Sequence, residues 1–197
     1  MEPFYVGEDE PPGKRKILVA ALKLFVRDGL CETSIRDIAA ASGFTNPALF
    51  KHFSGKGALA DYLFERCYLE LYGIVHTIVG GSRGFPEKHR ALIEAYLAAV
   101  SRDSNSVLYV QEGLRFFWPR MPAAVRRHSI LGQIRRLLED GQLQGLVTKE
   151  IEITFLTTAW VGTLQQFVRA KYFGEFQQDT RELARSLETL LTKMVQA

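Results

Sequence analysis

The 197-residue sequence has only two cysteines, Cys31 and Cys67. They form no Cys-x-x-Cys pair and no disulfide framework, which favours a reducing compartment. No apolar run approaches the roughly 18 residues that a membrane-spanning helix needs. The first twelve residues are acidic and rich in proline, and they lack the apolar segment of a signal peptide. We therefore expect a cytoplasmic protein.

The sequence also lacks runs in which β-branched residues alternate with polar ones, the pattern typical of strands. Apolar residues instead recur three or four positions apart along most of the chain, which predicts helices. Glycines, prolines and polar pairs interrupt this pattern. We predict an all-α fold, with three short helices between Gly13 and Ser54. Longer helices are expected over residues 56–80, 86–101, 105–117, 122–141, 148–172 and 176–195.

The net charge of +3 is too small to indicate a nucleic-acid partner by itself. Its distribution is more informative, because residues 1–12 carry four acidic side chains and no basic one. Residues 13–56 carry eight basic and three acidic side chains, a net charge of +5. A short basic module beside a nearly neutral body suggests a polyanion as partner, although such a cluster is more often a solvated face.

The three short helices have the order of a helix-turn-helix. A longer helix is followed by two shorter ones, which a tight turn at Ser42-Gly43 joins. In this arrangement the second short helix enters the major groove of DNA. Leu49 and Phe53 lie four positions apart on that helix and are expected to face the interior.

The helix that is expected to enter the groove begins with the segment TNPALFKHF, residues 45–53. Asn46 can pair with adenine, and Pro47 and Ala48 can contact thymine methyl groups. The lysines and the histidine that follow suit phosphates, which position a protein without reading sequence. The alternative is a small three-helix subdomain whose polar face is only solvated. The predicted DNA-binding residues are Arg36, Thr45, Asn46, Pro47, Ala48, Phe50, Lys51, His52 and Lys56.

The stretch TSIRDIAAASGFTNPALFKHFSGKGAL resembles the TetR-type transcriptional regulators, and the similarity extends over about residues 11–71. The sequence departs from the family pattern at Phe50, where the family usually has tyrosine, and at Phe44 and Gly57. Matching residues in register are Thr33, Ser34, Ile35, Asp37, Ile38, Ala39, Gly43, Leu49, His52, Phe53, Lys56 and Leu59.

This resemblance implies a homodimeric repressor that binds palindromic double-stranded operator DNA and is released by a small-molecule effector. The effector is expected inside the domain of long helices. We accordingly predict three parts of the chain: a mobile tail over residues 1–12, a helix-turn-helix DNA-binding domain over 13–55, and an effector-binding and dimerisation domain over 56–197.

The last two predicted helices are the candidate dimer contact. One three-helix head makes too few base contacts for a unique genomic address, so two heads about one DNA turn apart are expected. Each of the two helices carries a stripe suited to a symmetric contact, unless the stripes only close the core of their own protomer. The predicted dimer residues are Phe155, Ala159, Gly162, Gln166, Leu183, Leu187, Leu190 and Met194.

Large rings are frequent after residue 56, and they suit a site for a small apolar or aromatic effector. Most of these rings are expected to be ordinary core. Tyr72 is favoured, because its helix begins beside the DNA-binding domain and continues into the bundle. The candidate effector-binding residues are Tyr68, Tyr72, Tyr109, Phe117, Trp118 and Trp160.

Motifs of enzymes find little support. GGSRG, residues 80–84, matches the Gly-x-Ser-x-Gly motif but lacks the strand that this motif needs before it. The four histidines have no metal-binding spacing. We therefore predict no catalytic residue, no metal site and no cofactor. The alternative to a DNA-binding regulator is a helical enzyme or adaptor protein whose N-terminal helices only pack.

Overall fold

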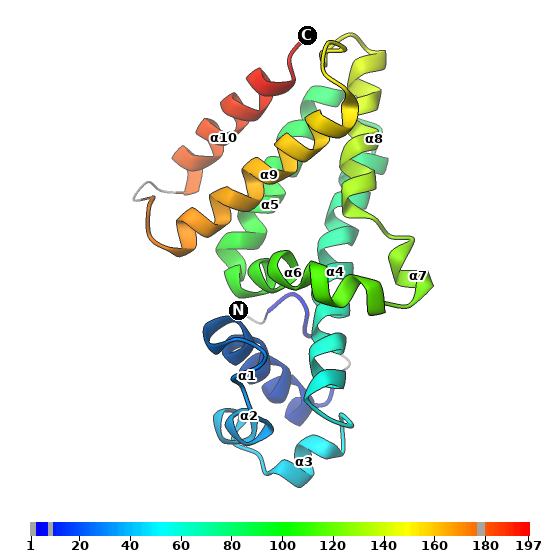
Figure 1. The fold of residues 1–197 in the computed structure, drawn as a ribbon. Helices are drawn as coiled ribbons and strands as arrows, with labels where there is room; N and C mark the ends of the chain where they lie inside the picture. Colours follow the sequence, from blue (N-terminus) through cyan, green and yellow to red (C-terminus); the bar gives the residue numbers. More distant parts are fainter. Residues whose placement is uncertain (1–2, 8–9, 177–179) are drawn as a thin grey trace. The chain divides into compact units, whose positions relative to one another are not determined.

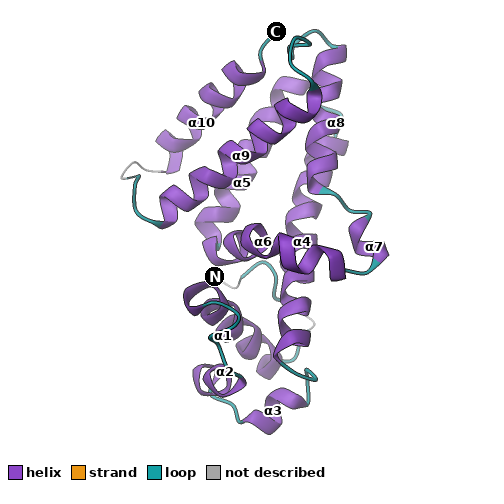
Figure 2. Cartoon of the chain, viewed as in Figure 1, coloured by secondary structure: helices purple, strands orange, loops and turns teal. Residues whose placement is uncertain are grey.

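The computed structural model describes residues 3–7, 10–176 and 180–197. This part of the chain is helical, and its one β-type contact is an isolated bridge between Val147 and Gln196 (Figures 1 and 2). The all-α prediction is confirmed. The helices are α1 (Pro12–Asp28), α2 (Ile35–Ser42), α3 (Asn46–Phe50), α4 (Lys56–Gly80), α5 (Phe85–Arg102), α6 (Ser104–Phe117), the 3-10 helix η1 (Trp118–Arg120), α7 (Ala123–Arg126), α8 (Ile130–Leu143), α9 (Ile153–Tyr172) and α10 (Thr180–Val195).

The ends of α2 are set by side chains that satisfy its free backbone groups. The Ser34 hydroxyl accepts a hydrogen bond from the Asp37 amide, and the Asp37 carboxylate accepts one from the Ser34 amide. This reciprocal pair is a capping box, and it fixes where α2 begins. Gly43 ends the helix in the left-handed conformation, with φ at 75°, and so turns the chain toward α3.

The chain forms two compact units, each with its own core. The first unit consists of residues 1–70 and 102–127, and the second of residues 71–101 and 128–197. This grouping by contact places residues 56–70 of α4, together with α6, η1 and α7, with the three N-terminal helices, whereas the sequence suggested a boundary at residue 56. The core of the second unit is built from Val79, Phe85, Leu92, Ile93, Leu97, Ile134, Leu137, Leu138, Val147, Leu156, Trp160, Leu164, Phe167, Leu183, Leu187, Leu191 and Val195.

Two of the predicted long helices have different bounds. The single helix expected over 122–141 is divided, because the chain leaves α7 at Arg127 and the Ser129 side chain caps a new helix, α8. The helix expected from residue 148 begins at Ile153. Thr148 instead donates its amide hydrogen to the carbonyl of Val195, at 2.8 Å, and residues 149–151 bend before α9 begins.

Residues 3–7 and 10–12 pack within the first unit, whereas the sequence predicted a mobile tail over residues 1–12. Tyr5 is only 2% exposed, and Arg66 donates to its carbonyl oxygen at 3.4 Å. The carboxylate of Glu10 accepts a hydrogen bond from the hydroxyl of Tyr62. Apolar side chains within an otherwise acidic, proline-rich segment account for the difference, because their burial stabilises the bound arrangement.

Candidate DNA-binding site

The site predicted to read DNA lies at the start of α3, and two buried side chains hold that helix in place. Leu49 is 1% exposed and Phe53 is 9% exposed, as predicted for residues that face the interior. With these two positions inward, Thr45, Pro47 and Phe50 are exposed on the other side. Asn46 and Ala48 are half-buried, at the edge of this surface. These five residues therefore give α3 an accessible patch along its short length, from Thr45 to Phe50.

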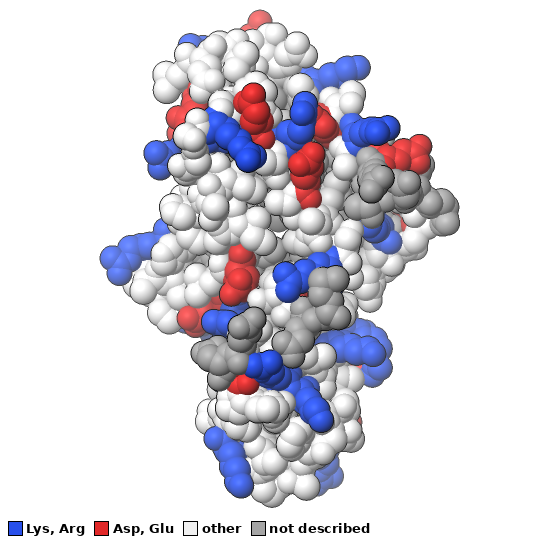
Figure 3. All heavy atoms as spheres, turned by 180° about the vertical axis from the view of Figure 1, so that it is seen from behind, with Lys and Arg blue, Asp and Glu red and all other residues white. Residues whose placement is uncertain are grey.

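Basic side chains surround this patch. Arg36 on α2 is exposed, as are Lys51 and His52, which follow α3 directly. In Figure 3, the surface formed by α1 to α3 shows more Lys and Arg side chains than acidic ones. A surface of this charge suits contacts to phosphate, which orient a protein on the duplex.

Lys56 differs from the other predicted DNA contacts, because its ammonium group binds within the protein. Its Nζ donates to the carbonyl oxygens of Leu30 at 2.7 Å, Cys31 at 3.2 Å and Thr33 at 2.7 Å. A lysine has three donors, and all three are used here. In the DNA-free protein the Lys56 ammonium group thus contacts the turn between α1 and α2, and a phosphate contact at this residue stays a prediction.

Lys14 is a second basic residue whose charge faces inward. Its Nζ is 2.9 Å from Oε2 of Glu10 and 4.2 Å from the ring centroid of Tyr62. The same ammonium group lies 5.5 Å from the ring centroid of Phe53. Because of these contacts, the basic count of residues 13–56 overstates the charge that is presented to a partner.

Four of the six candidate effector residues belong to the first unit, where they pack around Phe64. The Phe117 ring centroid lies 4.9 Å from that of Phe64, and the Tyr68 centroid 6.0 Å. Trp118 packs on Tyr68, at 4.8 Å. Tyr109 donates its hydroxyl to the carbonyl of Ala60, at 3.0 Å. These rings form a continuous aromatic core, which is the ordinary role that the sequence also allowed.

The other two candidates, Tyr72 and Trp160, belong to the second unit. Trp160 is buried, and its indole nitrogen donates to Nε2 of His89 at 2.9 Å. Burial lowers the pKa of His89 to about 4, so this histidine is neutral near pH 7. Tyr72 is half-buried, with its hydroxyl 3.3 Å from Nδ1 of His76 and its ring 4.8 Å from that of His128. Sequence analysis missed these three histidine contacts, because the partners lie far apart in the chain or carry no motif.

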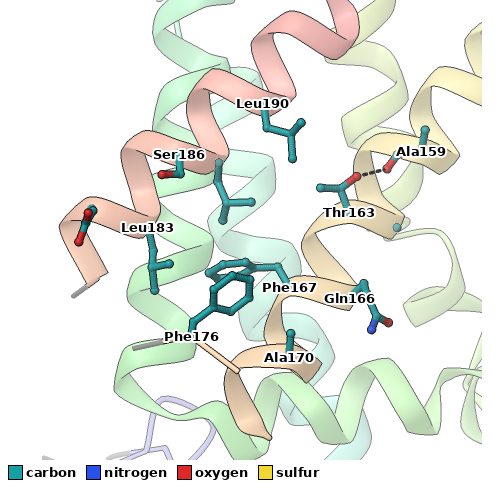
Figure 4. Close-up of a pocket in the computed structure, with 12 residues that line it drawn as sticks. Ala159, Thr163, Gln166, Phe167, Ala170, Phe176, Leu183, Ser186 and Leu190 are labelled. Atoms are coloured by element: carbon teal, nitrogen blue, oxygen red, sulfur yellow. Dashed lines mark hydrogen bonds between the residues drawn. The ribbon is translucent and has the colours of Figure 1, made fainter. Parts of the chain in front are cut away.

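The predicted dimer residues lie on α9 and α10, beside a surface hollow of about 770 Å³ (Figure 4). Phe155, at 73% exposed, and Leu190, at 50%, leave most of their apolar surface in water. Leu183 and Leu187 are buried, and Met194 packs partly against the core of the unit. The hollow is lined by Ala159, Gly162, Thr163, Gln166, Phe167, Ala170, Phe176, Glu182, Leu183, Ser186, Leu187 and Leu190.

Comparison with known proteins agrees with this geometry. Residues 17–63 match the model of the bacterial regulatory proteins of the tetR family. The transcriptional repressor KstR2 of Rhodococcus jostii is 27% identical over 158 residues, which cover 76% of this chain and 78% of that protein. No described helix is both long and apolar enough to cross a membrane.

Solved structures share the fold over nearly the whole chain. A tetR-family regulatory protein from Rhodococcus RHA1 superposes with a TM-score of 0.80 at 19% identity, covering 95% of this chain and 99% of that one. The regulator FadR of Bacillus subtilis, solved in complex with stearoyl-CoA, has a TM-score of 0.70 at 16% identity, covering 92% and 99%.

The arrangement of α1 to α3 defines a helix-turn-helix regulatory protein. The N-terminal domain of the chain, over residues 17–63, belongs to the TetR family of transcriptional regulators.

Proposed function

We propose that this protein is a repressor that binds palindromic operator DNA as a homodimer and releases it when an apolar effector binds. One observation carries the DNA-binding part: Leu49 and Phe53 are buried, which leaves the start of α3 and its basic neighbours accessible. Because its proposed partner is genomic DNA, the protein is proposed to act in the cytoplasm. An enzyme or adaptor whose N-terminal helices only pack would have no need for this accessible patch.

Base reading is proposed for the first turn of α3. The Asn46 amide can donate to and accept from the edge of adenine, and Pro47 and Ala48 offer apolar contact to a thymine methyl group. Lys51 and His52 are proposed to contact phosphate, and Arg36 on α2 to contact a base or phosphate. Phosphate contacts hold the helix in the groove, so that the short reading surface is presented in one register.

Dimerisation is proposed through the exposed faces of α9 and α10. Phe155, Ala159, Gly162 and Gln166 follow one another at helical spacing and are all exposed. In a two-fold contact the same surface of both copies meets, and small residues at its centre allow the helices to approach closely. A second copy would also cover Leu190 and fill the hollow beside it.

The effector is proposed to be a small apolar or aromatic molecule that binds in the helical domain after residue 56. The fold shared with FadR of Bacillus subtilis, which was solved in complex with stearoyl-CoA, supports a largely apolar ligand. Tyr72 is the favoured contact, because its side chain is only half-buried and has two histidine rings beside it. The effector must bind the DNA-free arrangement more tightly than the DNA-bound one, since equal affinity shifts no equilibrium.

Selection of genomic fragments by the purified protein tests this function. Recovered fragments are expected to share a palindrome whose half-sites lie about one DNA turn, or a multiple of it, apart. Retention should weaken steeply as salt is raised, because binding releases counterions from phosphate. Recovery of no common site, with no salt-dependent retention, would contradict the proposal and favour the enzyme or adaptor.

A further inference from the structure

Lys56 joins two parts of the first unit that are distant in sequence. It is the first residue of α4, and its three acceptors lie in the turn between α1 and α2, 23 to 26 positions earlier. The carbonyls belong to Leu30, Cys31 and Thr33. These carbonyl groups lie beyond the end of α1, so no amide within that helix satisfies them. The ammonium group of Lys56 thus caps this turn from outside.

The turn that Lys56 holds leads directly into α2. Thr33 is buried, and its hydroxyl donates to the carbonyl of Gly29 at 2.8 Å. Ser34, the next residue, is the cap of α2. The start of α2 is therefore fixed by contacts on both sides, from α1 through Thr33 and from α4 through Lys56. Since α2 packs against α3, the position of this turn affects how both helices are oriented toward DNA.

We propose that Lys56 is a positioning residue for DNA reading and makes no phosphate contact of its own. This inference rests on the proposed DNA-binding function. Lys56 acts through the turn at residues 30–33, and it holds the angle of α2 and α3 against α4. Lys51, five positions earlier, carries the same charge but is exposed, so it is the matched phosphate contact.

Lysine reactivity in the unmodified protein is the first test. The purified protein is treated briefly with acetic anhydride, free and bound to a selected genomic fragment, and modification is measured by mass spectrometry. Lys56 should react slowly in both states, since its three hydrogens are engaged. Lys51 should react rapidly in the free protein and slowly in the complex. Rapid reaction of Lys56 in the free protein, with protection only in the complex, would overturn the inference.

Salt dependence separates the two lysines energetically. Lys51→Met should weaken specific and non-specific DNA alike and lower the magnitude of the salt slope by about 0.9. Lys56→Met should weaken the selected site about tenfold and non-specific DNA by less than about threefold, with a slope close to that of the unmodified protein. If Lys56 only stabilised the fold, the ratio of specific to non-specific affinity would not change while the protein stays folded. Lys56→Arg, which restores a charged donor, should recover part of the specific affinity.

The outcomes distinguish this inference from the proposed function. One outcome is that Lys56→Met lowers the salt slope of DNA binding as much as Lys51→Met does, and weakens specific and non-specific binding equally. That result would show that Lys56 contacts phosphate and that the inference is wrong. If the unmodified protein shows no salt-dependent DNA binding, the proposed function itself fails. If Lys56→Met does not fold, the reactivity of Lys56 in the unmodified protein decides alone.

Discussion

The two units differ in what they leave on the surface. In the first unit, α3 turns Leu49 and Phe53 inward and leaves polar and basic side chains outside. In the second unit, α9 and α10 leave Phe155 and Leu190 in water, and Leu190 lines an apolar hollow. A charged surface suits a hydrated polyanion, whereas an exposed apolar surface suits a protein partner that removes it from water. The contrast leads us to propose DNA reading by the first unit and assembly by the second.

A charge at the centre of the proposed dimer contact should have the largest effect. Gly162→Glu is expected to give monomers, and operator affinity should fall by about 100-fold or more once two heads no longer bind together. Gln165→Glu adds the same charge at an exposed position about 60° around α9 from Gly162, outside the stripe of proposed contacts, and is the control. Light scattering and DNA titration measure the two effects. A Gly162→Glu protein that remains dimeric would disprove this interface.

Low pH should lower the stability of the second unit, because His89 becomes protonated. The folded-state pKa is about 4, below the ordinary 6.5, because burial disfavours the charged imidazolium. Between these values the unfolded chain binds more protons, so stability falls as pH drops from about 6.5 to about 4, by up to about 3 kcal/mol. Protonation would also place two donors face to face, since the indole of Trp160 already donates to Nε2 of His89.

The free energy of unfolding in urea, measured at pH 7 and pH 4, checks this expectation. His89→Gln keeps an acceptor for the indole but does not titrate, so the difference between the two pH values should shrink in this variant. Carboxyl groups contribute equally to both proteins and cancel in the comparison. An unchanged pH dependence in His89→Gln would show that this histidine is not the titrating group.

Effector binding in the helical domain is proposed to control DNA binding by the first unit. A coupling of about 1–3 kcal/mol would lower operator affinity about 5- to 150-fold, and operator DNA would lower effector affinity by the same factor. Stearoyl-CoA, the ligand in the FadR structure, is a suitable first probe. Tyr72→Ala should lower the affinity of the protein for the probe. Operator affinity in the absence of an effector should stay unchanged. A compound that binds beside Tyr72 without changing operator affinity would mean that this site does not control DNA release.

Removal of the hydrogen bond between Tyr62 and Glu10, which holds the N-terminal segment in the first unit, should have the smallest effect. Tyr62→Phe removes the hydroxyl that donates to the Glu10 carboxylate, at an expected cost of about 1–2 kcal/mol of stability. Hydrogen bonds from Lys14 and Tyr62 outweigh desolvation and hold the pKa of Glu10 below its usual range. That contribution is therefore present near pH 7 and is lost as the carboxyl becomes protonated in acid. Equal stability of Tyr62→Phe and the unmodified protein at pH 7 would show that the anchor contributes nothing.

Local features of the first unit were predictable from sequence. The Ser34 and Asp37 capping box depends on residues three apart, and the inward direction of Leu49 and Phe53 follows from helical spacing. Such patterns are complete within a few residues. The helix order of the DNA-binding head could be predicted for this reason.

Contacts across long sequence separations could not be predicted. Nothing near Lys56 indicates that its acceptors lie in a turn 23 to 26 positions earlier, and composition alone favoured a phosphate contact. The burial of Tyr5 was hidden by acidic neighbours. Aromatic content likewise predicted rings near an effector but did not show that Tyr109 and Phe117 pack around Phe64. In each case the sequence showed the type of side chain, but tertiary packing decided which residues it contacts.

A base-pair scan with Asn46→Ala tests the central claim most directly. Affinities of the unmodified protein and the variant are measured for the selected operator, for each single base-pair substitution in it, and for non-specific DNA. The variant should lose about 1–3 kcal/mol on the operator, keep its non-specific affinity, and lose discrimination at one base pair in each half-site. Equal losses on the operator and on non-specific DNA, with discrimination intact at every position, would contradict base reading by α3.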